Sequence, residues 1–177
     1  MTEPIDIDTA RTYLKADGDD DDLITTQIAS ATNVCEDYCN RVFYATAEAQ
    51  ETDFVQALTD RTTALANRKA ALALITGDEQ DDDDTRGLIT DHYIEVLADI
   101  SQRINGIVID DAINAAILIT LGHLYKNRED NLSTGNNVVQ VPVGAQRILQ
   151  SKLWIGNLAG SGVGTERRRH CLPNEGS

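Results

Sequence analysis

Residues 110–130 read DDAINAAILITLGHLYKNRED, and this stretch predicts a helix around which the rest of the chain folds. Apolar side chains recur every three or four residues, as on one face of an α-helix. Leu118 and Ile119 add apolar groups on other faces, so the helix is apolar almost all round. Such a helix lies at the centre of a structure, covered by partner helices or by neighbouring subunits. Asp110 or Asp111 is expected to cap it. The predicted core face consists of Ile113, Ala116, Ile117, Leu121, Leu124 and Tyr125.

The composition of the whole chain suits helices packed side by side. Its 177 residues are 41% hydrophobic but only 5% aromatic, and they fit one domain with an excursion. The formal net charge of -14 argues against a protein that grips DNA, because that function needs clustered Lys and Arg. No run reaches the roughly 18 apolar residues of a membrane span. The acidic N-terminus MTEPIDIDTA lacks the features of a signal peptide, so we expect a protein kept in cytosol-like solution.

The N-terminal part predicts two helices. Helical spacing indicates a short helix over about residues 8–15, and an acidic run, 19–22, follows it. That run lies where the bare N–H groups of a second helix favour carboxylates, and its spacing does not fit a calcium-binding EF-hand loop. The second helix is expected over about residues 22–44. Its apolar stripe consists of Ile24, Ile28, Ala31, Cys35, Tyr38 and Val42.

Residues 45–109 predict a helical hairpin. A first arm ends before Gly77, and a second arm runs from about Leu88 to Ile104. The sequence GDEQDDDDTRG at residues 77–87 is highly charged, with a glycine at each end, and predicts a solvated loop at the tip. The two arms form a coiled-coil-like excursion with an Ala-rich contact face.

The C-terminal part predicts a short extended run at residues 138–141, a turn at Pro142 and Gly144, and a last amphipathic helix over 145–154. The Gly-rich, Arg-containing residues 154–177 are expected to form a flexible tail. The overall prediction is an all-α bundle of about four main helices with a long helical-hairpin insertion, a short extended segment and a flexible tail. Residues 1–153 form one helical domain, with residues 45–109 as the insertion.

No catalytic motif is present, so we expect a protein that is not an enzyme and has no cofactor. Carboxylates are abundant but scattered over polar faces and loops, where raised pKa values are not expected. Cys35 and Cys39 lie one helical turn apart, but no second pair completes the four ligands of a zinc site. We therefore predict buried thiols and no metal.

The helix that begins near Asp110 ends in a cluster of aromatic, basic and acidic groups: Tyr125, Lys126, Asn127, Arg128 and Glu129. Arg beside Tyr is a frequent combination at the centre of protein interfaces. Alternatively, the cations only complement the negative end of the helix dipole. The basic cluster Arg167, Arg168, Arg169 and His170 is open to two interpretations as well: a solvated tail, or a docking segment that orders on a partner.

The chain resembles the head–tail connector (adaptor) proteins of tailed phages. The resemblance rests on AILITLGHLYKNRED, with its Tyr-x-Asn-Arg-Glu ending, on the VPVGAQRIL that follows it, and on YLKADGDDDDLITTQIASATNVCEDYCNRVF near the N-terminus. It covers residues 7–43 and 110–153. It does not cover the hairpin or the Arg-rich tail.

This resemblance implies a structural virion protein of the phage neck, assembled in the host cytoplasm as a ring usually of about twelve copies. The ring would lie beneath the portal protein and hold the tail-completion or stopper protein, with DNA passing through its lumen without sequence-specific binding. An acidic lumen would let DNA slide. Subunit contacts are then expected at Tyr125, Asn127, Arg128, Glu129, Ile117 and Leu118, and portal docking at Arg167, Arg168, Arg169 and His170. The alternative is another acidic helical interaction module, such as a stopper or an adaptor of a different complex.

Overall fold

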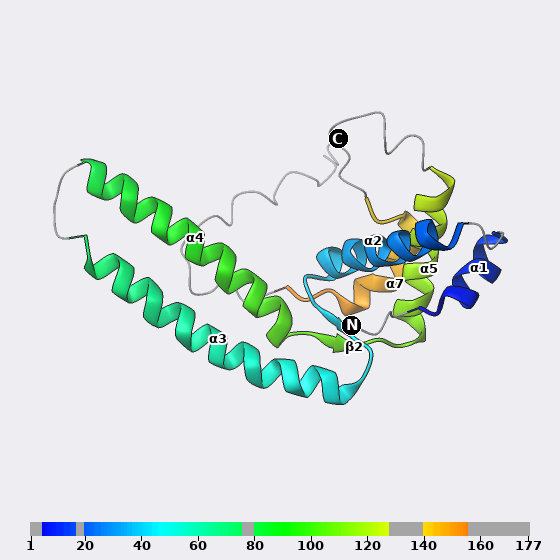
Figure 1. Cartoon of the computed structure of the whole chain (residues 1–177), viewed down its shortest axis with the longest axis horizontal. Helices are drawn as coiled ribbons and strands as arrows, with labels where there is room; N and C mark the ends of the chain where they lie inside the picture. Colours follow the sequence, from blue (N-terminus) through cyan, green and yellow to red (C-terminus); the bar gives the residue numbers. More distant parts are fainter. Residues whose placement is uncertain (1–4, 17–19, 76–79, 128–139, 156–177) are drawn as a thin grey trace, which may run out of the picture.

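The computed structural model describes residues 5–16, 20–75, 80–127 and 140–155, and it confirms the all-α class. A small helical bundle carries a long antiparallel hairpin that extends to one side of it (Figure 1). The bundle consists of α1 (Ile7–Leu14), α2 (Asp21–Cys39), α5 (Asp111–Lys126) and α7 (Val143–Leu149), and the 3-10 turn η2 (Gln150–Lys152) follows α7. The hairpin consists of α3 (Ala47–Ala73) and α4 (Gln80–Ile104), and its base carries the short strands β1 (Phe43–Tyr44) and β2 (Ile107–Val108).

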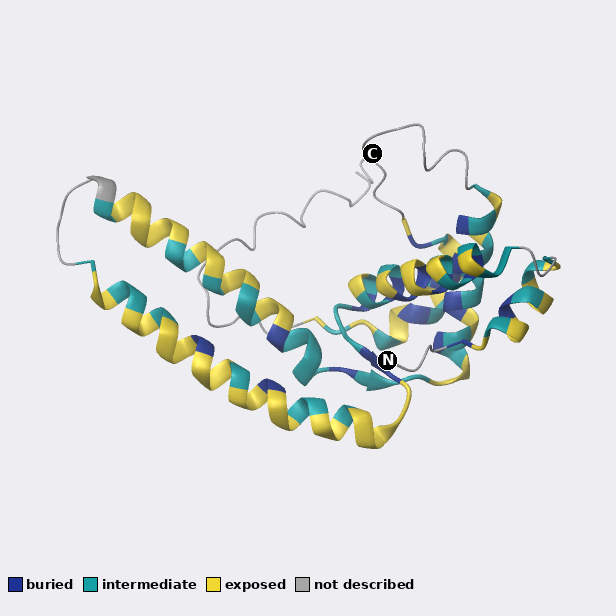
Figure 2. Cartoon of the chain, viewed as in Figure 1, coloured by how far each residue is buried: buried dark blue, intermediate teal, exposed yellow. Residues whose placement is uncertain are grey.

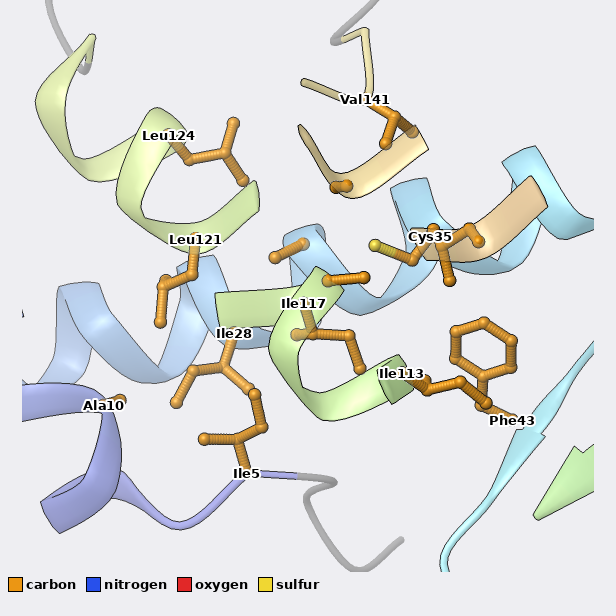
Figure 3. Close-up of a cluster of buried hydrophobic side chains, with 14 of the residues drawn as sticks. Ile5, Ala10, Ile28, Cys35, Phe43, Ile113, Ile117, Leu121, Leu124 and Val141 are labelled. Carbon is orange, nitrogen blue, oxygen red and sulfur yellow. The ribbon is translucent and has the colours of Figure 1, made fainter. Parts of the chain in front are cut away.

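Helix α5 is the centre of the bundle. α1, α2 and α7 all contact it, and side chains from each of them meet in one apolar cluster (Figure 3). Its N-cap is Asp110, whose carboxylate accepts a hydrogen bond of 2.9 Å from the N–H of Ile113. The predicted core face is confirmed, because five of its six residues are buried and Tyr125 is packed against the cluster. Helices of this chain therefore supply the cover that the apolar sequence of α5 demands.

Helix α2 ends earlier than its periodicity predicts, at Cys39 rather than near Tyr44. Asn40 adopts a left-handed backbone conformation with φ 55°, which terminates the helix and which Asn tolerates better than most residues. The chain then becomes extended. Val42, which we had assigned to the helical stripe, has left the helix: its N–H donates to the carbonyl of Gln102 and its carbonyl accepts from Ile107.

The two strands at the base of the hairpin were not predicted. β1 pairs in parallel with β2, with Phe43 opposite Ile107 and Tyr44 opposite Val108. Two residues per strand carry no readable alternation, so the sequence offers no period-2 signal for them. Their pairing joins the start and the end of the hairpin to each other where the hairpin meets the bundle.

The hairpin tip differs from the prediction. We expected a solvated loop over residues 77–87, but α4 already begins at Gln80, so most of that segment is helical. Asp82, Asp83 and Asp84 of that segment occupy the first turns of α4, where the helix dipole favours negative charge. The first arm, α3, begins at Ala47, and its N-cap is Thr46, whose side chain accepts a hydrogen bond of 3.2 Å from the N–H of Ala49.

The C-terminal helix also begins and ends earlier than predicted. Pro142 is the N-cap of α7, so Val143 and Gly144 belong to the helix instead of a turn. The regular helix stops at Leu149, and beyond η2 the N–H of Trp154 donates to the carbonyl of Cys39 over 3.0 Å. Val141 is buried and lies in no helix or strand. Val138 and Val139 of the predicted extended run lie outside the described residues, as do residues 156–177 of the predicted tail.

Candidate interaction surfaces

A cluster of polar side chains fixes the hairpin where it leaves the bundle. We call it the hairpin root: Tyr44 from β1, Asp53 and Asp60 from α3, and Arg103 from α4. The Arg103 guanidinium binds Asp53 at 2.6 Å and Asp60 at 2.7 Å, and the Tyr44 hydroxyl donates to Asp53. The fork of donors on Arg103 thus spans two turns of α3. This arrangement sets the axial register of the two arms.

Electrostatic interactions in the hairpin root stabilise the charged forms of Arg103, Asp53 and Asp60. Hydrogen bonding from Arg103 lowers the pKa of both Asp53 and Asp60 below the ordinary aspartate value. Their two carboxylates in turn raise the pKa of Arg103. Burial, followed by the hydrogen bond to Asp53, raises the pKa of Tyr44, so the phenol remains a donor at neutral pH. The root is a structural joint and has no group poised for proton transfer.

Sequence reasoning did not identify the hairpin root. Asp53 and Asp60 are seven residues apart and therefore lie on one face of α3. Arg103 stands in the last turn of α4. That Arg103 faces the two carboxylates becomes evident only once the two arms are paired. The part of this cluster that the sequence could have indicated is the spacing of the two carboxylates on α3.

The backbone around the root is satisfied by side chains from both sides. Arg41 donates to the carbonyl of Asn105, and Gln50 donates to the carbonyl of Gly106 over 2.7 Å. The carboxylate of Glu36 accepts from the N–H of Phe43 over 2.7 Å, and burial raises the pKa of Glu36. These bonds link the end of α2, the strands and both arms. The joint is therefore held by directional contacts rather than by apolar packing alone.

The C-terminal end of α5 contains the residues that we expected to contact a neighbouring subunit. The hydroxyl of Tyr125 donates to the carboxylate of Asp20 over 2.5 Å, which ties the end of α5 to the start of α2. Asn127 caps α5 through its backbone N–H, which donates to the carbonyl of His123. Arg128 and Glu129 lie outside the described residues. At this end, Tyr125 makes a contact within the chain, and Asn127 is half-buried.

The acidic run before α2 also makes contacts within the chain. Asp21 binds Arg11 of α1, and hydrogen bonding from Arg11 lowers the pKa of Asp21. Asp20 accepts from Tyr125, as above. The expectation that these carboxylates lie at a helix N-terminus is confirmed for Asp21 and Asp22.

Ile117, which we expected at a contact with another subunit, is 0% exposed because it is buried in the apolar cluster of its own chain, so it offers no surface to a neighbour. Leu118 is half-buried and borders a shallow depression, so part of it faces solvent. The other residues along that depression are Asp8, Thr9, Thr12 and Tyr13. The basic residues Arg167, Arg168, Arg169 and His170 lie outside the described part of the chain.

The prediction of buried thiols is confirmed for the two cysteines that the structure describes. Cys35 and Cys39 are free and buried, and burial raises the pKa of each to about 11. The sulfur of Cys35 lies 3.5 Å from the hydroxyl oxygen of Thr120. Within the described residues, no group of three or more His, Cys, Asp or Glu side chains is placed to hold a metal ion.

Comparisons with known proteins identify no relative of this chain. No protein-family model matches the chain, and no curated protein or solved structure matches it. Among the described helices, none is both long and apolar enough to cross a membrane. The described residues form a helical protein with a bundle, a hairpin held to it by the polar hairpin root, and exposed helix faces.

Proposed function

We propose that this chain is a structural, non-enzymatic head–tail connector (adaptor) subunit that acts by assembly. In this role it forms a ring beneath a portal protein in the neck of a tailed phage. The ring extends the DNA channel and provides the attachment site for tail or stopper proteins. Its net charge of -14 suits a lumen through which DNA passes without being held.

One observation carries the proposal. The two segments that resemble connector proteins, residues 7–43 and 110–153, are separated by the whole hairpin in sequence. Their helices nevertheless pack into a single apolar cluster around α5. The hairpin lies outside the resemblance and has a separate, smaller cluster. The resemblance thus coincides with a physical unit, as expected if that unit is a connector body with an insertion.

The contacts that we assign to this function lie at the end of α5 and at the C-terminus. Arg128 and Glu129 remain our candidates for subunit contacts, together with Leu118, which is partly exposed. Tyr125 and Asn127 support that end of the helix through their bonds within the chain. Arg167 to His170 would contact the portal.

The proposal is tested by measuring the mass of the purified protein with and without its cognate portal, by light scattering and native mass spectrometry. A ring of about a dozen copies, free or only on the portal, supports the connector function. A strict monomer that ignores the portal would instead support the alternative, another acidic helical interaction module.

The portal contact has its own test. A chain lacking residues 160–177 should lose affinity for the portal while its helical content and thermal unfolding stay those of the full chain. Unchanged portal affinity would rule out the tail as the docking segment.

A further inference from the structure

The outer surface of α4 carries a row of acidic and apolar side chains. We call it the acidic face: Asp84, Leu88, Asp91, Glu95 and Asp99. Successive members are four, three, four and four residues apart, so they lie on one side of the helix. All five are exposed, and Leu88 leaves 72% of its surface in solvent. Leu88 is the apolar member of a row that is otherwise acidic.

The outer surface of α3 carries the complementary chemistry. We call it the basic face: Val55, Leu58, Arg61, Leu65 and Lys69. Its apolar members are 56%, 44% and 40% exposed in chain order, and both cations are exposed. From residue 61 to the end of α3, the helix has three basic residues and no acidic one. The outer half of α3 is therefore positive in a chain that is otherwise strongly acidic.

The charges on the two faces have no partners within the described part of the chain. Neither Arg61 nor Lys69 forms an ion pair there, and neither do Asp91, Glu95 and Asp99. Between Arg61 and Lys69 on α3, the Nε atom of Arg68 is buried without a hydrogen-bond partner. In contrast, Arg103 at the hairpin root is fully engaged by two carboxylates.

One hairpin cannot satisfy its own two faces. The α4 residues that pack on α3 belong to the hairpin cluster and include Val96, Leu97 and Ile100. At about 100° per residue, Asp91 and Glu95 fall on the opposite side of α4 from that cluster. The basic face likewise lies beside, and not on, the buried Ala57–Ala64 surface of α3. Figure 2 shows both arms exposed along most of their outer surfaces.

The two faces lie at the same height along the hairpin. The arms run antiparallel (Figure 1), and the hairpin root fixes Arg103 beside Asp53 and Asp60. Moving outward from this point, Arg61 comes to the height of Asp99 and Lys69 to the height of Asp91. A second hairpin placed beside the first, without sliding along it, would bring these opposite charges together.

We propose that the basic face of one copy binds the acidic face of the next copy, so that the hairpins form a repeating contact between subunits. Such a contact joins two different surfaces and closes into a ring when the rotation between copies closes. It accounts for the unpaired charges of both signs on the two arms. The location of this contact in a phage neck rests on the proposed function, whereas the existence of the contact between copies does not.

The test uses charge reversal in the full chain. One variant carries Arg61→Glu and Lys69→Glu on the basic face, and the other carries Asp91→Lys and Glu95→Lys on the acidic face. Because like charges then meet, each variant alone should associate about tenfold or more weakly than the wild type. Mixed in equal amounts, the two should regain wild-type association, since each reversed face meets a reversed partner. Native mass spectrometry should show alternating assemblies, and added salt should weaken wild-type association.

A matched control carries Asp22→Lys and Asp37→Lys, which are exposed residues of α2 in the bundle, away from both faces, and which change the net charge as much as the acidic-face variant does. It should associate like the wild type. Circular dichroism and thermal unfolding establish that every variant keeps its fold, which is expected because the altered side chains are exposed. Wild-type association by both single variants, or no recovery in the mixture, would overturn the inference. So would a wild type that stays monomeric both alone and with the portal.

The two proposals fail separately. If the wild type forms a ring on the portal and both variants form it equally well, the hairpin contact is wrong and the connector function stands. If association depends on the paired faces but the protein ignores the portal, the hairpin contact stands and the connector function is wrong.

Discussion

The bundle and the hairpin are both built from helices but are stabilised differently. The bundle cluster has sixteen buried residues, and branched aliphatic side chains such as Ile28, Ile113 and Leu149 are fully buried. The hairpin cluster has only three buried residues, Ala57, Ala64 and Ile100. The difference arises because α5 is covered by three helices, whereas each hairpin arm is covered by one.

This contrast shows where the free energy of folding is concentrated. Fully burying an aliphatic side chain contributes about 1.5–3 kcal/mol, whereas a buried Ala contributes much less. The Ala contacts bring the arms close together without a large apolar gain. The hairpin therefore depends on its polar root and, in an assembly, on whatever covers its outer faces.

The largest expected effect is in the bundle. Ile117→Ala should lower the free energy of unfolding by about 2–5 kcal/mol, because it opens a cavity in a fully covered site. Urea denaturation followed by circular dichroism measures the change. Leu65→Ala on the hairpin, where the side chain is 40% exposed, should stay within about 0.5 kcal/mol of the wild type. Equal losses at both positions would contradict the comparison.

A smaller loss is expected where the hairpin joins the bundle. A Cβ added at Gly106 would overlap Cε2 of Tyr44, and the Val42 carbonyl oxygen would be 3.0 Å away. The aromatic ring belongs to the hairpin root, so it cannot move aside without disturbing Asp53. Gly106→Ala should cost about 1–3 kcal/mol in thermal unfolding. An unchanged midpoint would mean that the joint is looser than its contacts indicate.

The charge network of the root should give the hairpin an acid-sensitive component. Asp53 and Asp60 have lowered pKa values, so their contribution is present above the unfolded value of about 3.9 and is lost as pH falls through the lower folded values. Because 28% of the Arg103 side chain is exposed, Arg103→Gln should cost about 1 kcal/mol at neutral pH. That cost should shrink in strong acid.

The measurement is urea denaturation of Arg103→Gln and wild type from neutral to acid pH. Arg86→Gln is the matched control, because the Arg86 side chain is 47% exposed and pairs with Asp83 only at 3.9 Å. The control should show little change at any pH. A loss for Arg103→Gln that does not vary with pH would assign its role to packing alone.

The smallest effect should have the opposite sign. Gly87 lies inside α4, and a Cβ added there would meet nothing within 4 Å, so Gly87→Ala should stabilise the outer part of that helix by about 0.5–1 kcal/mol. Amide hydrogen exchange in α4 measures it, and exchange should slow near residue 87 while α5 remains unaffected. Faster exchange near residue 87 would indicate that glycine is required at this position of α4.

Local pattern in the sequence was sufficient for most of the helices. Apolar spacing located α1, α5 and the two hairpin arms, and it identified the core side of α2, because periodicity is a property of neighbouring residues. The order of the elements then led to the all-α class. The candidate site was harder to predict from the sequence. Tyr125 was singled out for a contact outside the chain, but its partner Asp20 is more than a hundred residues away in sequence.

The sequence by itself determined which segments are helical and which sides of them are apolar, because both depend on residues within a few turns of each other. Only the tertiary structure decided that Ile117 is enclosed by its own chain and that Tyr44 and Arg103 meet on Asp53. Each of these outcomes depends on contacts between distant segments. Such contacts are selected by packing and hydrogen-bond satisfaction across the whole fold, and no local pattern encodes them.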